Sequence, residues 1–215
     1  MKILVNSYPR SGTTTFVNAI RLACLGKISD FGDEFFHKEN WVAKSHIPII
    51  FLGNYENILI STVIRKPSDA ITSNCFRWSN GYTGNIVNGK IVVDKSREIK
   101  ENKFDDTLIN LIDHQILQYE SYYECLKNGN SNVKIFTYEQ TQNDIVSSIN
   151  KIMLLSGSDI KNLNYEPAIN IVKNPPQPTK EKTNLYYQIK EYIENSSNFL
   201  KCNELYNFAL QRSIF

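Results

Sequence analysis

The sequence predicts an α/β fold of three layers, in which helices cover both faces of a parallel sheet. Short apolar segments alternate with helix-compatible segments up to residue 156, and such alternation produces parallel strands joined by crossover helices. The first apolar segment, 2–6, also runs directly into a loop of small residues that opens a helix. A chain of 215 residues is long enough to bury a sizeable core. We therefore expect a single domain over residues 1–215.

The first half of the chain supplies three of the expected strands. Strand 2–6 is apolar, and helix 13–25 starts where the following loop ends. Strand 41–45 is followed by Pro48, which stops its continuation. Strand 57–64 is apolar in the manner of a buried strand, and a turn that carries Pro67 leads to helix 68–79.

The second half completes the sheet and adds further helices. Helix 105–127 places its apolar residues on one face, with acidic residues in its first turn and Gly129 after its end. Strand 132–137 then runs into helix 141–156. The segment 173–183 is rich in proline, so we expect an extended connector there. Two last helices are expected at 184–194 and 203–211.

The segment 80–103 is an irregular insertion with one recognisable pattern. Apolar residues alternate from Ile86 to Val92 around a central Asn88-Gly89 pair. This pattern predicts a β-hairpin with a type I′ turn. The hairpin can lie over the mouth of a site as a lid, or it can be a surface hairpin without ligand contact.

Composition excludes several classes of protein. Hydrophobic residues make up 41% of the chain and charged residues 21%, with a net charge of +2, which gives no argument for binding nucleic acid or an anionic membrane. No apolar stretch is long enough to span a bilayer, and no signal peptide is visible. The four cysteines are scattered and form no Cys-x-x-Cys pair, so we expect free thiols in a reducing cytoplasm and no metal site.

The loop between strand 2–6 and helix 13–25 predicts a site for a phosphate-like anion. Its sequence from Tyr8 to Thr14 is Tyr-Pro-Arg-Ser-Gly-Thr-Thr. Amides at such a loop and the positive end of the helix dipole attract anions. The alternative is a plain turn in which Ser11 or Thr13 caps the helix. The loop is not a Walker A motif, because no lysine follows Gly12, and strand 57–64 ends in Arg65 rather than a metal-binding aspartate.

Two further segments place polar groups where strands end. Lys44 and His46 close strand 41–45, at the edge where open α/β sheets form their sites. Elsewhere a single histidine is more often structural than catalytic. Arg65 ends strand 57–64, and Ser73 lies eight residues later on helix 68–79. The alternative for Arg65 is a local ion pair with Asp69 at the start of that helix.

Together these motifs resemble those of sulfotransferases that use 3′-phosphoadenosine 5′-phosphosulfate (PAPS). The matching segments are the loop, Lys-Ser-His at 44–46, Arg-x-Pro-x-Asp-x-x-x-Ser at 65–73 and a weaker Tyr-Glu at 138–139. The resemblance implies the P-loop NTPase-like fold of that family. It also implies transfer of a sulfuryl group from PAPS to a hydroxyl or amine of a small-molecule or glycan acceptor, with release of 3′-phosphoadenosine 5′-phosphate (PAP). The sequence does not identify the acceptor.

The resemblance assigns a role to each matching residue. His46 is the general base, and Lys44 and Arg10 stabilise charge on the sulfuryl group. Arg65 and Ser73 bind the 3′-phosphate, and Tyr138 contacts the adenine. No metal is required. The 5′-phosphate is held by the loop and the first turn of the helix, where the hydroxyls of Thr13 and Thr14 contribute. The residues concerned are Ser11, Gly12, Thr13, Thr14 and Thr15.

The chain departs from the family pattern in three places. The loop cation is Arg10 where lysine is usual, and Thr15 stands where an aromatic residue is common. The C-terminal Arg-Lys-Gly segment that completes the 3′-phosphate site is absent, and Lys180 or Lys182 can substitute for it. Two alternative functions stay open. One is a P-loop nucleotide or small-molecule kinase; the other is a non-catalytic nucleotide-binding module, against which the retention of Lys44 and His46 argues.

Overall fold

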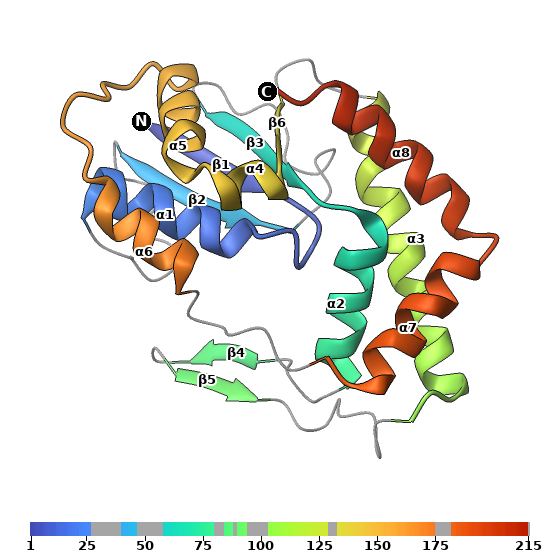
Figure 1. Ribbon diagram of the computed structural model, residues 1–215. Helices are drawn as coiled ribbons and strands as arrows, with labels where there is room; N and C mark the ends of the chain where they lie inside the picture. Colours follow the sequence, from blue (N-terminus) through green and yellow to red (C-terminus); the bar gives the residue numbers. More distant parts are fainter. Residues whose placement is uncertain are drawn as a thin grey trace.

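Four parallel strands form the central sheet, in the order β2-β1-β3-β6 (Figure 1). The computed structural model describes residues 1–26, 40–46, 58–79, 84–87, 90–93, 103–128, 133–174 and 182–214. The strands are β1 (Lys2–Asn6), β2 (Trp41–Ser45), β3 (Leu59–Ile64) and β6 (Lys134–Thr137). Both faces of the sheet are covered, which explains why these strands are nearly continuous apolar runs.

Helices pack on the two faces as separate layers. Consecutive residues of β1 show this directly, since Ile3 and Val5 enter one hydrophobic core and Leu4 enters the other. The first core is shared with α1 (Thr13–Leu25), α5 (Ile145–Leu155) and α6 (Tyr165–Lys173) (Figure 1). The second is shared with α2 (Pro67–Ser79), α3 (Asp106–Asn128), α7 (Asn184–Asn195) and α8 (Phe199–Gln211). The predicted three-layer α/β fold is therefore confirmed.

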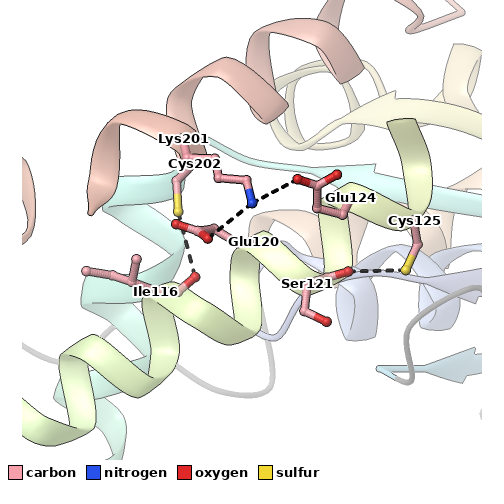
Figure 2. Close-up of polar contacts among 7 residues, drawn as sticks. All are labelled: Ile116, Glu120, Ser121, Glu124, Cys125, Lys201 and Cys202. Carbon is pink, nitrogen blue, oxygen red and sulfur yellow. Dashed lines mark hydrogen bonds and ion pairs between the residues drawn. The ribbon is translucent and has the colours of Figure 1, made fainter. Parts of the chain in front are cut away.

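The α3–α8 contact shows how the C-terminal helices are attached (Figure 2). Lys201 on α8 reaches two carboxylates of α3, with its Nζ 2.9 Å from Glu124 and 3.7 Å from Glu120. Beside it, the buried thiol of Cys202 points at the carbonyl of Ile116 at 3.7 Å. All four cysteines are free thiols, as predicted. In the part of the chain that the structure describes, no helix is both long and apolar enough to cross a membrane.

Helix boundaries differ from the predicted ones where side chains cap the backbone. The helix expected at 141–156 is two helices, α4 (Tyr138–Asn143) and α5, because Asp144 leaves the helical conformation and accepts a hydrogen bond from the Ser147 amide at 3.0 Å. Helix α6 was not expected; it begins after Asn164, whose side chain accepts from the Glu166 amide at 3.3 Å. Helix α8 begins at Phe199, four residues before its predicted start.

The predicted hairpin in the insertion is confirmed. Strands β4 (Gly84–Val87) and β5 (Lys90–Val93) pair antiparallel. The Asn88-Gly89 turn lies outside the described residues, as does most of the 173–183 connector. The role of the hairpin as a lid stays a prediction.

A capping box at Thr137 joins β6 to α4 and generates a stability prediction. The Gln140 amide donates to Thr137 Oγ1 at 3.2 Å, and the Thr137 amide donates to Gln140 Oε1 at 3.0 Å. We expect Thr137→Val to lower the free energy of unfolding by about 1 kcal/mol, because one buried cap is lost. Urea unfolding measures this. The control is Thr141→Val in the same helix, whose hydroxyl only donates back to the Tyr138 carbonyl. We expect a smaller loss there, and equal losses would contradict the capping argument.

Candidate anion-binding and catalytic site

The site is built where the four parallel strands end. Strands β1 and β3 are neighbours, and the connection after β1 leads to β2 on one side whereas the connection after β3 leads to β6 on the other. Such a reversal is the usual position of a ligand site in an open α/β sheet. At this edge the strands deliver, in order across the sheet, Lys44 and His46 from β2, the 7–12 loop from β1, Arg65 from β3 and Tyr138 from β6. The structure thus brings the predicted segments to one edge.

The loop has the backbone conformation of an anion cradle. Arg10 and Gly12 both adopt positive φ, at 67° and 82°, and left-handed residues of this kind turn successive amides toward one point. Gly12 is the N-cap of α1, and no side chain caps this helix. The alternative in which Ser11 or Thr13 merely caps the helix is therefore not what the structure shows. The first-turn amides of α1 remain directed at the loop.

The loop hydroxyls divide into two kinds. The Thr13 hydroxyl donates to Ser7 Oγ at 2.8 Å, inside the protein, so only the Thr13 amide is left to face a ligand. Ser11 Oγ is buried and has no hydrogen-bond partner among the described residues. Thr14 Oγ1 accepts from Lys44 Nζ at 3.2 Å. An unpaired buried hydroxyl is costly, and an anion in the loop can satisfy it.

Arg65 is held in place by the loop and by Tyr138. Its Nη1 donates to the Arg10 carbonyl at 2.9 Å, and its guanidinium lies over the Tyr138 ring at 4.5 Å. The Tyr119 hydroxyl donates to the Arg65 carbonyl at 3.2 Å. The alternative pairing with Asp69 is not formed, because Asp69 accepts from Lys190 at 2.9 Å. Among the described residues, therefore, no carboxylate holds Arg65 in place.

Ser73 lies against the loop as well. Its Oγ accepts from Arg10 Nε at 3.2 Å, so α2 and the loop meet at this point. Burial lowers the pKa of Arg10 to about 10, and the nearby positive charges of Arg77 and Arg65 add to this. Positive charges close enough to lower the pKa of Arg10 indicate a site that favours an anion.

The geometry of His46 suits a general base. Its Nδ1 lies 2.6 Å from the Ser7 carbonyl oxygen, and a carbonyl can only accept, so Nδ1 carries the proton. Nε2 then has a free lone pair in the neutral ring. Desolvation lowers the pKa of His46 below its ordinary value of 6.5, and the charge of Lys44 acts in the same direction. The ring is therefore neutral at pH 7.

Lys44 and the C-terminal lysines differ in how the structure places them. Desolvation lowers the pKa of Lys44, with smaller contributions from the charges of Arg21 and Arg77. Lys180 lies outside the described residues. Lys182 lies over the Tyr186 ring at 5.1 Å, and the charge of Arg65 affects the pKa of that tyrosine. The described contact of Lys182 is therefore with α7.

Solved structures with the same fold are found by comparison. The sequence matches no family model and no curated protein. The structure is similar to that of the mouse sulfotransferase SULT7A1 complexed with PAP, at a TM-score of 0.58 and 16% identity, over 99% of this chain and 84% of that one. It is also similar to retinol dehydratase in complex with androsterone and the inactive cofactor PAP, at a TM-score of 0.54 and 13% identity, over 100% and 82%. The chain has a sulfotransferase-like fold.

Some residues at this edge of the sheet were not foreseen from the sequence. Ser7 and Tyr119 carry no motif, and their roles depend on strands and helices that meet only in the folded chain. Arg77 had one available signal, because it lies four residues after Ser73 and so shares its helix face.

Gly12 generates a prediction about the loop. A Cβ at this position would lie 2.6 Å from Tyr138 Cδ2 and 2.9 Å from its Cε2, and φ is also positive. We expect Gly12→Ala to lower the free energy of unfolding by about 2 kcal/mol or more, from backbone strain and the clash together. Urea unfolding measures the loss.

Gly26 is the matched control, because its φ is 67° but no atom of the described residues lies within 4 Å of an added Cβ. We expect Gly26→Ala to show backbone strain alone, about 1 kcal/mol. Adding Tyr138→Ala to Gly12→Ala removes the clash and is expected to recover part of the difference. Equal losses for the two glycines would show that Tyr138 does not press on the loop.

Proposed function

We propose that this protein is a PAPS-dependent sulfotransferase, which transfers a sulfuryl group to a hydroxyl or amine of a small-molecule or glycan acceptor. The observation that carries the proposal is the position of a neutral His46 beside a cation-lined anion loop, with no printed contact to its Nε2 among the described residues. The fold, shared with two structures that contain PAP, supports it.

The proposed cofactor site uses groups from three strand ends. The amides from Ser11 to Thr15, with the hydroxyls of Ser11 and Thr14, hold the 5′-phosphate. Arg65 and Ser73 hold the 3′-phosphate, and Lys182 supplements them in place of the absent C-terminal motif. Tyr138 contacts the adenine; its ring already stacks on the Arg65 guanidinium. The unpaired Ser11 hydroxyl and the cluster of cations fit such an anionic ligand.

The proposed reaction is a displacement at sulfur. The acceptor oxygen or nitrogen attacks the sulfur of PAPS, and the bond between sulfur and the bridging oxygen breaks with its electron pair going to that oxygen. The acceptor proton passes to His46 Nε2. Lys44 and Arg10 stabilise the negative charge that develops on the sulfuryl and bridging oxygens. PAP leaves, and the hydrogen bond from Nδ1 to Ser7 holds the ring in the productive tautomer throughout.

The two alternatives are less well supported by the residues present. A kinase of the P-loop type uses a Walker lysine and a metal-binding aspartate, and this chain has Thr13 and Arg65 at those places. A non-catalytic module would have no need for a histidine held in one tautomer. Binding experiments separate all three.

Calorimetric titration tests the cofactor assignment. We expect the protein to bind PAP equally with and without magnesium, and to bind ATP more weakly. We also expect Arg65→Ala to weaken PAP binding at least about tenfold, because a charge-assisted contact to phosphate is lost. Binding of adenosine 5′-phosphosulfate, which lacks the 3′-phosphate, should change far less.

Arg212→Ala is the matched control for that variant. Arg212 also donates to a backbone carbonyl, that of Leu126, and also lies over an aromatic ring, that of Phe208, but it follows α8 rather than β3. Its removal should leave PAP affinity within about twofold, since it offers no contact to the ligand. Magnesium-dependent ATP binding with no response to PAP would instead support the kinase alternative.

The pH dependence of turnover tests His46. Its folded-state pKa is lowered, so the ring is a neutral base above that pKa and loses this capacity as the pH falls through it. We expect kcat/KM to fall on the acid side below pH 6.5. On the alkaline side it should fall as the pH rises toward about 10, where Arg10 loses its proton. Radiolabelled PAPS with a responsive acceptor measures the profile.

His46→Gln should lower kcat about a hundredfold or more and abolish the acid limb. The control is His114→Gln, at an exposed position on α3, for which the profile should be unchanged. Retention of the acid limb in His46→Gln would remove His46 from the role of base.

A further inference from the structure

Helix α3 supplies no ligand-binding residue to the proposed site, but it holds the segments that form it. It packs beside α2 (Figure 1), and Gln115 and Tyr119 stand about one turn apart on its buried face. Both side chains contact segments that carry proposed cofactor-binding residues. Helix α3 therefore fixes how far apart these segments lie.

One side-chain oxygen of Gln115 joins two of these segments. The Tyr8 hydroxyl donates to Gln115 Oε1 at 2.8 Å, and Asn74 Nδ2 donates to the same oxygen. Tyr8 is the first residue of the anion loop motif, and its carbonyl accepts from the Ser11 amide at 3.3 Å. Asn74 follows Ser73 directly on α2. Gln115 Oε1 therefore ties the loop to the part of α2 that carries Ser73.

The three side chains of this network are closed off from water. Tyr8, Asn74 and Gln115 are 1%, 5% and 4% exposed. Burial raises the pKa of Tyr8 well above its ordinary value, so its hydroxyl keeps its proton and stays a donor. Without Gln115 Oε1, two buried donors would lose their acceptor, and water could not replace it without opening the core. Loss of this oxygen is therefore expected to loosen the loop from α2.

Tyr119 attaches a third segment to the same helix. Its ring packs edge-on against the Tyr8 ring at 5.0 Å, and its hydroxyl donates to the Arg65 carbonyl at 3.2 Å. The loop, the end of β3 and α2 are thus all fixed to two consecutive turns of α3. The Arg10–Ser73 hydrogen bond also links the loop to α2. Both of those side chains are assigned to the ligand, however, so that bond cannot hold the distance independently of it.

The distance that Gln115 holds matters for a ligand with two phosphates. In the proposed site the loop holds the 5′-phosphate, whereas Arg65 and Ser73 hold the 3′-phosphate. A nucleotide carries both groups at a separation that its ribose restricts. Binding of one phosphate therefore brings the other to its subsite at a high effective concentration only if the two subsites have the matching separation. A nucleotide with one phosphate does not need this match.

We propose that Gln115 is a positioning residue, which sets the separation of the two phosphate subsites and so gives the site its preference for a nucleotide phosphorylated at both the 5′ and 3′ positions. This inference rests on the proposed sulfotransferase function and names the residue behind its cofactor selectivity. Gln115 acts through Tyr8 and Asn74 and does not touch the ligand.

Comparison of PAP with adenosine 5′-phosphate tests the inference, because the two differ in the 3′-phosphate alone. Calorimetric titration, with competition against PAP where binding is weak, gives the ratio of their affinities. We expect wild type to prefer PAP at least about a hundredfold. Gln115→Leu should lower this ratio about tenfold or more, while the affinity for adenosine 5′-phosphate stays within about threefold. Tyr8→Phe removes only one of the two donors and should lower the ratio about threefold or more.

Tyr122→Phe is the matched control for these variants. It also removes a buried hydroxyl that bonds α3 to another element, since Tyr122 Oη lies 3.2 Å from Thr62 Oγ1 of β3, but this bond reaches neither the loop nor α2. Its affinity ratio should stay within about twofold of wild type. In the double variant Tyr8→Phe/Gln115→Leu the ratio should be no lower than in Gln115→Leu, because both changes break the same bond.

The outcomes separate this inference from the proposed function. A preference for PAP that survives Gln115→Leu or Tyr8→Phe would overturn the inference, and so would an equal fall in Tyr122→Phe. Equal losses of affinity for both nucleotides in Gln115→Leu would overturn it too. If Gln115→Leu does not fold, the comparison of Tyr8→Phe with Tyr122→Phe decides. If wild type itself does not prefer PAP, the proposed function fails and the inference fails with it.

Discussion

Ser7 is the junction on which the site depends. Its amide donates to the Ser45 carbonyl of β2 at 3.2 Å, and its carbonyl accepts from the His46 ring at 2.6 Å. Its hydroxyl accepts from Thr13 at 2.8 Å and from the Val63 amide of β3 at 3.3 Å. One buried residue therefore ties three strand ends and the start of α1 together. Because each of these bonds is buried or nearly so, a shift of the β1 end would break several at once.

The cations at this edge repel one another, and the fold has to hold them there. Arg65 is fixed by the Arg10 carbonyl and the Tyr138 ring rather than by a carboxylate, which keeps its charge available. Asp69, the nearest acidic residue in sequence, is drawn away by Lys190. The ion pair between Lys190 of α7 and Asp69 thus keeps this carboxylate from neutralising the cations of the site. A bound anion would relieve the repulsion and return the pKa of Arg10 toward its ordinary value.

Local sequence predicts the elements and their order, but not the contacts between distant segments. The carboxyl edge could be predicted because alternation of strands and helices fixes where each strand ends. The partner of Asp69 could not be, since Lys190 lies 121 residues away. The approach of Tyr138, which follows β6, to Gly12 of the first loop could not be predicted either. The separation of α4 from α5 at Asp144 could have been predicted, because an N-cap residue stands there before an apolar run. The prediction instead followed the apolar run and extended one helix through Asp144.

Backbone atoms make several of the contacts at this edge of the sheet. The Ser7 carbonyl sets the tautomer of His46, the Arg10 carbonyl holds Arg65, and the loop amides face the ligand position. A backbone carbonyl or amide offers the same hydrogen bond whatever side chain its residue carries. In the proposed function, side-chain chemistry is needed for charge and for a proton acceptor, as at Lys44 and His46, and at Gly12 an added Cβ would clash with Tyr138. Lys44, His46 and Gly12 lie in short motifs visible in the sequence, whereas the contacts that hold the strand ends together join segments far apart in the chain.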